Sequence, residues 1–353
     1  MKFKVLIILL FGATQLSAQL SEKSMSLHLG TGLGGLAPHK SSTTHLVMGP
    51  SIKLEAGVTF RTQGDKTFQR HYKFPYYGFV YSLNSTGNEP VLGNIHAVNI
   101  FGSIPFYRAD NPISFRAGIG LGYHTKKFNK YTNHKNNSIG SSLNTNIQFR
   151  IEKNFQILKG FKLNTGIGIS HYSNASFTRP NLGLNFFHLY LNADIPVRHF
   201  KYPGPDTTFR IAILPYSIWE HSIVVFGGLK EVGNAFGNKY FVGALTIQSS
   251  KRLNEYTSIV GGLDNYLNFA LKETENKLYQ EGLFATYMKH FGKLRLGISF
   301  GGYLLNQPEE GKLIYNKVII EYHISKRLFT QVLLKSHVTS ADFFGLTLGY
   351  QIR

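Results

Sequence analysis

The chain has 353 residues, a formal net charge of +19 and no cysteine. The absence of cysteine excludes a disulfide framework, thiol nucleophiles and Cys-ligated metals. Charged residues make up only 16%, against roughly 25% in typical soluble domains, whereas the 36 glycines and the 14% of aromatic residues are plentiful. The positive surplus attracts polyanions such as anionic lipid or nucleic acid, although general solubility of basic loops explains it equally well.

The N-terminal residues have the layout of a secretory signal peptide. Two lysines precede an apolar run at residues 5–11, and small residues lead to Ala18. We therefore expect a signal peptide over residues 1–18. The apolar run is too short for a membrane-spanning helix, and no later segment supplies the roughly 20 apolar residues that one needs. A membrane form of this chain must then be a β-barrel, and an exported chain meets anionic lipid rather than nucleic acid.

Most of the following chain alternates apolar and polar residues with a period of two, as half-buried strands do. In residues 51–62 one face holds Ile52, Leu54, Ala56, Val58 and Phe60, and the other holds Lys53, Glu55 and Thr59. Residues 113–125, 161–170, 317–325 and 344–353 repeat this pattern. Apolar-out and polar-in alternation is typical of a transmembrane β-barrel. A soluble β-sandwich or barrel with an aromatic core is the alternative.

The strand spacing predicts the size of the barrel. About 335 mature residues, at roughly 23 per strand and turn, give about 14 strands, with 12 to 16 as limits. We expect an all-β fold, a transmembrane antiparallel up-and-down β-barrel, as a single domain over residues 19–353 without a convincing repeat. Residues 198–209, rich in proline and charge, fit a long loop or a divide between two sub-regions.

Aromatic pairs stand near the expected strand ends, where barrels carry interfacial girdles. These pairs are Tyr76-Tyr77, Phe106-Tyr107, Phe186-Phe187 and Phe343-Phe344.

One expected hairpin carries polar residues on its apolar face. On residues 161–174 the odd positions form the outward row, and this row ends with His171 and Ser173. On the returning strand, residues 183–194, the outward row begins with Asn185. A hairpin places these three side chains close together on the outer face of the barrel.

Such a cluster matches the chemistry of a serine nucleophile. A serine hydroxyl is unreactive until an imidazole accepts its proton and a third group orients that imidazole. Asn174 and Asn181 bracket the turn, where a backbone N–H and a side-chain amide can stabilise an oxyanion. The alternative is an ordinary turn rich in Ser and Asn, with His171 capping a strand at the membrane interface.

The segment "ISHYSNASFTRPNLGLNFFHLYLN" resembles the outer-membrane lipid A 3-O-deacylases of the PagL type and the related acyloxyacyl hydrolase-like barrels. A looser similarity extends the deacylase-like region to about residues 110–195. The resemblance implies that Ser173 is the nucleophile and His171 the general base. It also implies an oxyanion hole made by the backbone N–H of Asn174 and the side chain of Asn181.

The same resemblance marks one departure from the family. The orienting residue of the familiar deacylases is a glutamate, and Asn185 stands at that position. The family's site faces the bilayer of the outer membrane, its substrate is lipid A of lipopolysaccharide, and it uses no cofactor. We therefore expect an outer-membrane serine esterase acting on lipid A or another anionic lipid.

Other polar clusters in the sequence are weaker candidates for a functional site. Residues 335–345 contain His337, Ser340 and Asp342, which we interpret as a hairpin turn because Ser340 and His337 fall on opposite faces of a regular strand. The histidines are scattered without close carboxylates, so no metal site is expected. A non-catalytic barrel, serving as a channel, structural or binding protein, stays as the alternative function, and the oligomeric state is left open.

Overall fold

The structure is a computed structural model that describes residues 24–107, 109, 111–158, 161–198, 219–233, 237–308, 312–337 and 340–352. The expected signal peptide and nearly all of the proline-rich stretch at 198–209 lie outside the described residues. Within the described ranges, no helix has the length and apolar character needed to cross a membrane.

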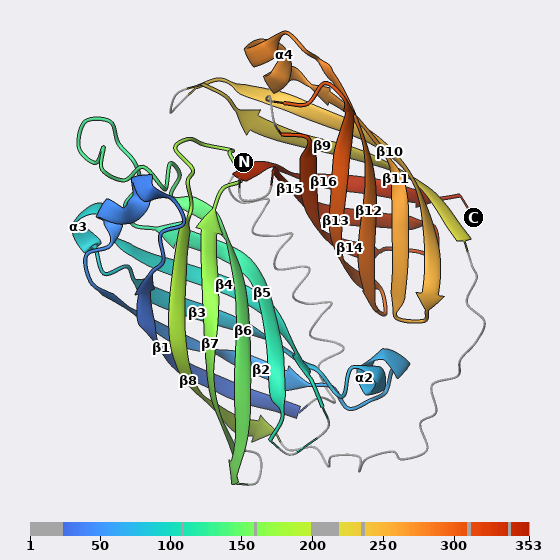
Figure 1. Cartoon of the computed structure of the whole chain (residues 1–353). Coiled ribbons are helices and arrows are strands. Elements are labelled where there is room, and N and C mark those ends of the chain that lie inside the picture. Colours follow the sequence, from blue (N-terminus) through green and yellow to red (C-terminus); the bar gives the residue numbers. More distant parts are fainter. Residues whose placement is uncertain are drawn as a thin grey trace, which may run out of the picture.

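The described residues form two closed antiparallel barrels of eight strands each (Figure 1). The first comprises β1 Ser24–Leu36, β2 Pro50–Arg61, β3 Tyr76–Ser85, β4 Asn94–Pro105, β5 Ile113–His124, β6 Leu143–Leu158, β7 Phe161–Ser173 and β8 Leu184–Arg198. The second comprises β9 Trp219–Glu231, β10 Lys239–Asn254, β11 Thr257–Asn268, β12 Tyr279–Phe291, β13 Leu294–Leu305, β14 Ile314–His323, β15 Leu328–His337 and β16 Ser340–Gln351. The short helices in the loops are η1 Ser41–Leu46, α2 Thr67–His71, α3 Glu89–Leu92 and α4 Phe269–Glu275.

The expected all-β transmembrane barrel class is confirmed, and the total strand number falls within the expected limits. The structure has two barrels instead of the single barrel that the sequence led us to expect. β8 pairs back with β1, and β16 pairs back with β9, so hydrogen bonding closes each set of eight strands on itself. In the sequence, residues 199–218 separate the two sets of strands.

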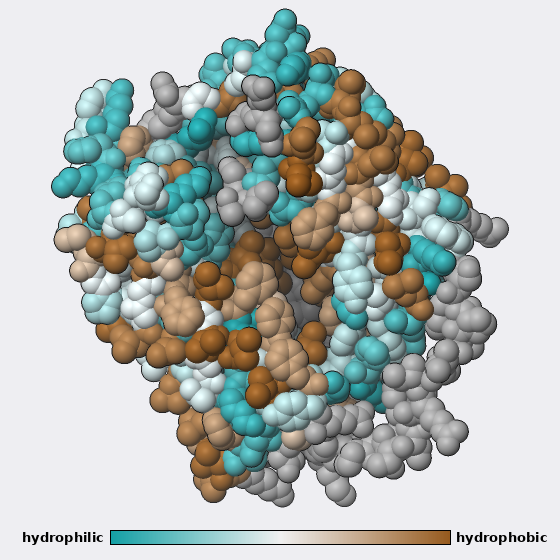
Figure 2. Space-filling view, viewed as in Figure 1, coloured by the Kyte–Doolittle hydropathy of each residue, from teal (hydrophilic) through white to brown (hydrophobic). Residues whose placement is uncertain are grey.

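The alternation along the strands separates an apolar outer wall from the lumen. On β2, Ile52 and Leu54 are about half exposed, whereas Lys53 and Glu55 are buried inside. In Figure 2, brown apolar side chains gather over the walls of both barrels, and teal polar ones gather at the end that carries α3 and α4. An apolar wall with polar ends is the surface that a bilayer selects.

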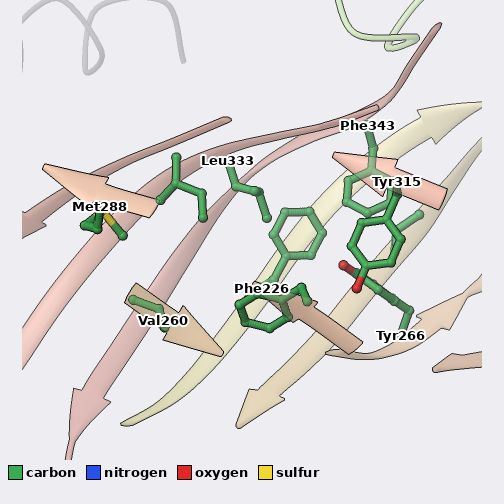
Figure 3. Close-up of a cluster of buried hydrophobic side chains, with 10 residues drawn as sticks. Phe226, Val260, Tyr266, Met288, Tyr315, Leu333 and Phe343 are labelled. Carbon is green, nitrogen blue, oxygen red and sulfur yellow. The ribbon is translucent and has the colours of Figure 1, made fainter. Parts of the chain in front are cut away.

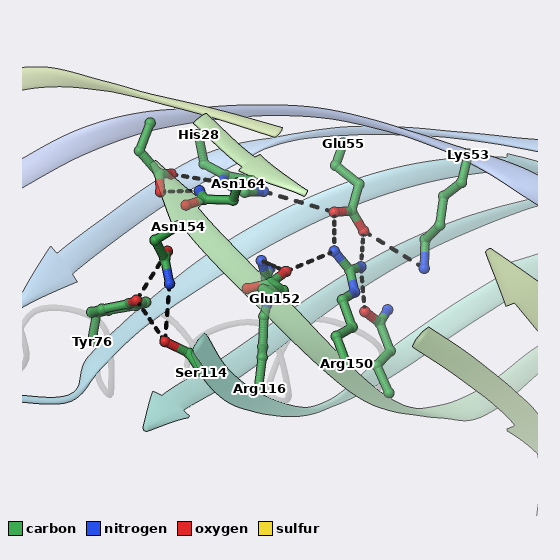
Figure 4. A network of polar contacts seen from close by, with 12 residues as sticks. His28, Lys53, Glu55, Tyr76, Ser114, Arg116, Arg150, Glu152, Asn154 and Asn164 are labelled. Atoms are coloured by element: carbon green, nitrogen blue, oxygen red, sulfur yellow. Dashed lines mark hydrogen bonds and ion pairs between the residues drawn. The ribbon is translucent and has the colours of Figure 1, made fainter. Parts of the chain in front are cut away.

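Buried ion pairs fill the lumen of the first barrel (Figure 4). Arg150 binds both carboxylate oxygens of Glu55, one of them at 2.7 Å, and Arg116 lies 3.3 Å from Glu152. The guanidinium of Arg150 also lies 3.7 Å from the ring centre of Tyr190. These charges are compensated at close range, as buried charges must be.

A cluster of buried apolar side chains lies inside the second barrel (Figure 3). The cluster includes Phe226, Val242 and Phe343. Buried ion pairs lie beside it, among them Lys317–Asp264 at 2.6 Å and Lys335–Asp342 at 3.6 Å. The expected aromatic pairs divide between the two sides of the wall. Phe343 and its counterpart Phe186 in the first barrel are fully buried in the lumens, so they are not girdle residues.

The two barrels contact each other at both ends. At one end the β7–β8 loop meets the β9–β10 loop, where the N–H of Glu231 donates to the carbonyl of Ser176 at 3.0 Å. At the opposite end His71, in α2, stacks on Tyr256 in the β10–β11 turn at 3.9 Å. The barrels therefore stand side by side. In each barrel the first strand begins and the last strand ends at the α2 end.

Candidate active site

The outward polar cluster lies where β7 and β8 meet the loop that joins them. His171 pairs directly with Asn185 in the antiparallel register, so strand geometry alone places their side chains side by side. Upstream on the same outer face, Ile167 and Ile169 are exposed, which matches the expected outward row. His171 is half-buried and Ser173 is buried, because the loop folds over them.

The three side chains form one hydrogen-bonded chain. Nε2 of His171 lies 2.9 Å from Oγ of Ser173, and Nδ1 of His171 lies 2.6 Å from Oδ1 of Asn185. An amide oxygen only accepts, so Nδ1 of His171 carries the proton and Nε2 has a free lone pair for the serine hydroxyl. This tautomer is the one that a general base next to Ser173 requires.

A second histidine, which the sequence did not indicate, extends this row of hydrogen-bonded side chains. Nδ1 of His39, in the β1–β2 loop, lies 2.9 Å from Nδ2 of Asn185. Desolvation and the charge of the neighbouring Lys40 lower the pKa of His39, which favours its neutral form. A neutral ring accepts from the amide NH₂, and this bond turns the carbonyl oxygen of Asn185 toward His171.

The two expected oxyanion donors are engaged with each other. The backbone N–H of Asn174 donates to Oδ1 of Asn181 at 3.0 Å, and the side chain of Asn174 bonds Ser141 and the carbonyl of Thr178. Oδ1 of Asn181 therefore occupies the backbone N–H of Asn174. Asn174 follows Ser173 directly in the chain, and Asn181 is linked to Asn174 by this hydrogen bond.

Glycine at 183 is required by the packing of the histidine. Its φ angle is +75°, and a Cβ built there would lie 2.8 Å from Cε1 of His171. A side chain at this position would therefore strain the backbone and push the imidazole away from its partners. Nothing in the sequence motif distinguishes Gly183 from an ordinary turn glycine.

The cluster in residues 335–345 faces the second lumen. Oδ1 of Asp342 lies 2.5 Å from Nζ of Lys230, and Nε2 of His337 lies 2.8 Å from the hydroxyl of Tyr303. The side chain of Ser340 lies outside the described residues. Across the described ranges, no three histidine or acidic side chains are grouped as a metal site requires.

Comparison with known families assigns both halves of the chain. Residues 52–194 match the model of the lipid A 3-O-deacylase (PagL) family, and residues 219–353 match that of the acyloxyacyl hydrolase C-terminal domain. The chain belongs to the PagL family. The PagL match contains β7, β8 and the candidate site, and the C-terminal match coincides with the second barrel.

The chain is also similar to solved structures, at low sequence identity. The outer membrane enzyme PagL is 19% identical with a TM-score of 0.34, over 48% of this chain and 99% of that one. Omp33 of Acinetobacter baumannii is 8% identical with a TM-score of 0.20, over 93% and 99% of the two chains. A mutant porin of Rh. blastica is 10% identical with a TM-score of 0.21, over 94% and 100%. No curated protein matches the chain.

Proposed function

We propose that this PagL-family protein is an outer-membrane serine esterase that removes an ester-linked acyl chain from lipid A or a related lipid. One observation carries the proposal. The two ring nitrogens of His171 bond Ser173 on one side and Asn185 on the other, on the outer wall of a barrel. Three polar side chains facing acyl chains are costly unless they satisfy one another and meet an amphipathic substrate there.

The geometry supports a two-step acyl transfer. His171 takes the proton from Oγ of Ser173 as this oxygen attacks the ester carbonyl, and it returns the proton to the leaving sugar oxygen. The acyl group stays on Ser173 until water, activated by the same imidazole, releases it as a fatty acid. Asn185 holds the ring in the required tautomer but, being neutral, adds no charge to stabilise the imidazolium.

Oxyanion stabilisation requires a local exchange of partners in the loop. The N–H of Asn174 is free to bind a developing oxyanion once Oδ1 of Asn181 moves away. Rotation of the Asn181 amide would then present its NH₂ to the same oxygen, so that both groups donate. The proposal thus assigns Asn174 and Asn181 to the oxyanion hole in the substrate complex.

Loop lengths favour a site in the outer leaflet. Most loops at the end of the site, such as residues 125–142 and 269–278, exceed the turns at 255–256 and 292–293 at the other end. The loop at residues 62–75, which carries α2, is a long connection at that other end. Outer-membrane barrels place long loops outside and short turns in the periplasm. Ser173, at the loop end of β7, would then lie at the level of the outer-leaflet esters.

The test is mass spectrometry of lipid A from cells that express the wild-type protein, Ser173→Ala or a matched control. Thr165→Ala is a suitable control, because Thr165 lies exposed on the outer face of the same strand. The wild type and the control should remove one acyl mass, and Ser173→Ala should remove none while the barrels still fold. Identical lipid A profiles in all three strains would refute the esterase.

The interior of the first barrel argues against a channel. Lys53, Glu55 and Arg150 cross its lumen and are at most 4% exposed. Ion conductance in planar bilayers together with a complete lack of esterase activity would nevertheless support the non-catalytic alternative.

A further inference from the structure

A cavity of about 620 Å³ lies where the two barrels meet, at the end that carries the candidate site. The first barrel supplies one wall through its β7–β8 loop and Lys40 of its β1–β2 loop. The second barrel supplies the rest through the ends of β9, β15 and β16, helix α4 and the β13–β14 loop. Small-molecule sites in proteins typically enclose about 300–1,000 Å³. We call it the interbarrel cavity.

Two residues that line the interbarrel cavity also lie next to residues of the proposed esterase site. Asn181 lines the cavity and also accepts from the N–H of Asn174, next to Ser173. Lys40 lines the cavity too, and it follows His39, which bonds Asn185. A molecule that occupies the cavity is therefore separated from Ser173 only by the β7–β8 loop.

The lining of the cavity carries a surplus of positive charge. Its cationic side chains are Lys40, Arg179, Lys230 and Lys312, with His337 beside them. They come from both barrels, so neither barrel alone assembles the set.

The acidic residues of the lining are engaged with the protein. Glu231 accepts from the backbone N–H groups of Arg179 and Gly237, at 3.3 and 3.1 Å. Glu275 pairs with Lys277 at 3.2 Å. Asp342 is shared between Lys230 and the buried Lys335, at 2.5 and 3.6 Å. The ion pairs of Asp342 and Glu275 are therefore with lysines other than Lys40. Nη1 of Arg179 donates to the carbonyl of Gly233 at 2.7 Å.

We propose that the interbarrel cavity binds the phosphorylated sugar headgroup of the lipid substrate, so that the second barrel selects what the first barrel hydrolyses. The proposal rests on the esterase function proposed above. Arg and Lys donate charge-assisted hydrogen bonds to phosphate oxygens. With the headgroup in the cavity, the acyl chains run down the apolar wall past Ile169 and Phe187, and the ester lies at Ser173.

Binding can be measured separately from hydrolysis. In detergent micelles, the Ser173→Ala protein should bind a bisphosphorylated lipid A at least tenfold more tightly than the same lipid after phosphatase treatment. Arg179→Gln and Lys312→Gln, each placed in that background, should remove this preference. Lys326→Gln, an exposed lysine in the turn at the opposite end, is the control and should leave the preference intact.

Kinetics of the active protein give the second readout. Arg179→Gln and Lys312→Gln should raise KM about tenfold for the phosphorylated lipid and leave kcat unchanged. A neutral ester in the same micelles should be hydrolysed as by the wild type. Inorganic phosphate, added as a competitor, should weaken lipid binding only at millimolar concentrations, because it lacks the acyl chains.

The outcomes separate the two proposals. Phosphate-dependent binding without hydrolysis by the wild type would keep the headgroup site and refute the esterase. Hydrolysis with equal affinity for both lipids, or with equal affinity in all the cavity variants, would overturn the headgroup site. Competition by micromolar inorganic phosphate would also overturn it, since the site would then bind a free anion instead of the lipid.

Discussion

Asn185→Asp tests the hydrogen-bonded chain most directly, because it changes one NH₂ group into an oxygen without altering the side chain's length. The oxygen 2.6 Å from Nδ1 of His171 becomes a carboxylate oxygen, and the donor to His39 is lost. Neutral His39 can respond by placing its proton on Nδ1 and donating to the new carboxylate.

The magnitude follows from the change in one hydrogen bond. A bond to a charged group is worth about 1.5–3 kcal/mol, against about 0.5–1.5 kcal/mol for a neutral one. The carboxylate strengthens this bond most when His171 is positively charged in the transition state. A gain of about 1.4 kcal/mol corresponds to about a tenfold rise in kcat. Asn185→Glu should act in the same direction, but its extra methylene must fit between the two rings.

The assay is deacylation of lipid A micelles by purified, refolded protein, with heat-modifiable migration on gels as the measure of folding. Asn185→Leu serves as the matched control, because it removes both polar contacts at similar volume, and kcat should fall by about 100-fold or more as the tautomer is released. A folded Asn185→Asp protein that loses most of its kcat would refute the assignment of Asn185 as the orienting residue.

Two further substitutions test the packing around the site and the interior of the barrel. Gly183→Ala should lower kcat by about tenfold or more, because the new methyl displaces the imidazole of His171. The protein should still migrate as a folded barrel. Unchanged kinetics would show that the loop absorbs the methyl. Arg150→Leu leaves Glu55 buried without its main partner, so the free energy of unfolding in urea should fall by about 3–5 kcal/mol. The double replacement Arg150→Leu with Glu55→Leu should recover much of the loss. Equal stability of the single and double variants would contradict this account.

Local alternation made the wall of the barrels predictable. Side chains on a strand alternate strictly, so the outward row through Ile167 and Ile169 to His171, and the position of Asn185 on the next strand, follow from counting residues. Hairpin pairing needs only the turn between the strands. The proximity of Ser173, His171 and Asn185 was therefore accessible from the sequence, although their catalytic roles stay a proposal.

The pairing of first and last strands that closes each barrel was not predictable from the sequence in the same way. A strand pattern is the same whether β8 pairs with β1 or with β9, so strand counting does not distinguish one barrel of sixteen strands from two of eight. The contact of His39 with Asn185 joins residues 146 positions apart. Phe186 and Phe343 were expected at the interface, but their parity on β8 and β16 turns them inward.

The backbone contacts between the β7–β8 loop and the β9–β10 loop have a consequence for how the protein behaves in a crowded membrane. Because both barrels belong to one polypeptide, the contact between Ser176 and Glu231 forms at a high effective concentration. Each candidate site is thus supplied with its own neighbouring barrel, at a fixed one-to-one ratio that dilution in the lipid plane does not alter.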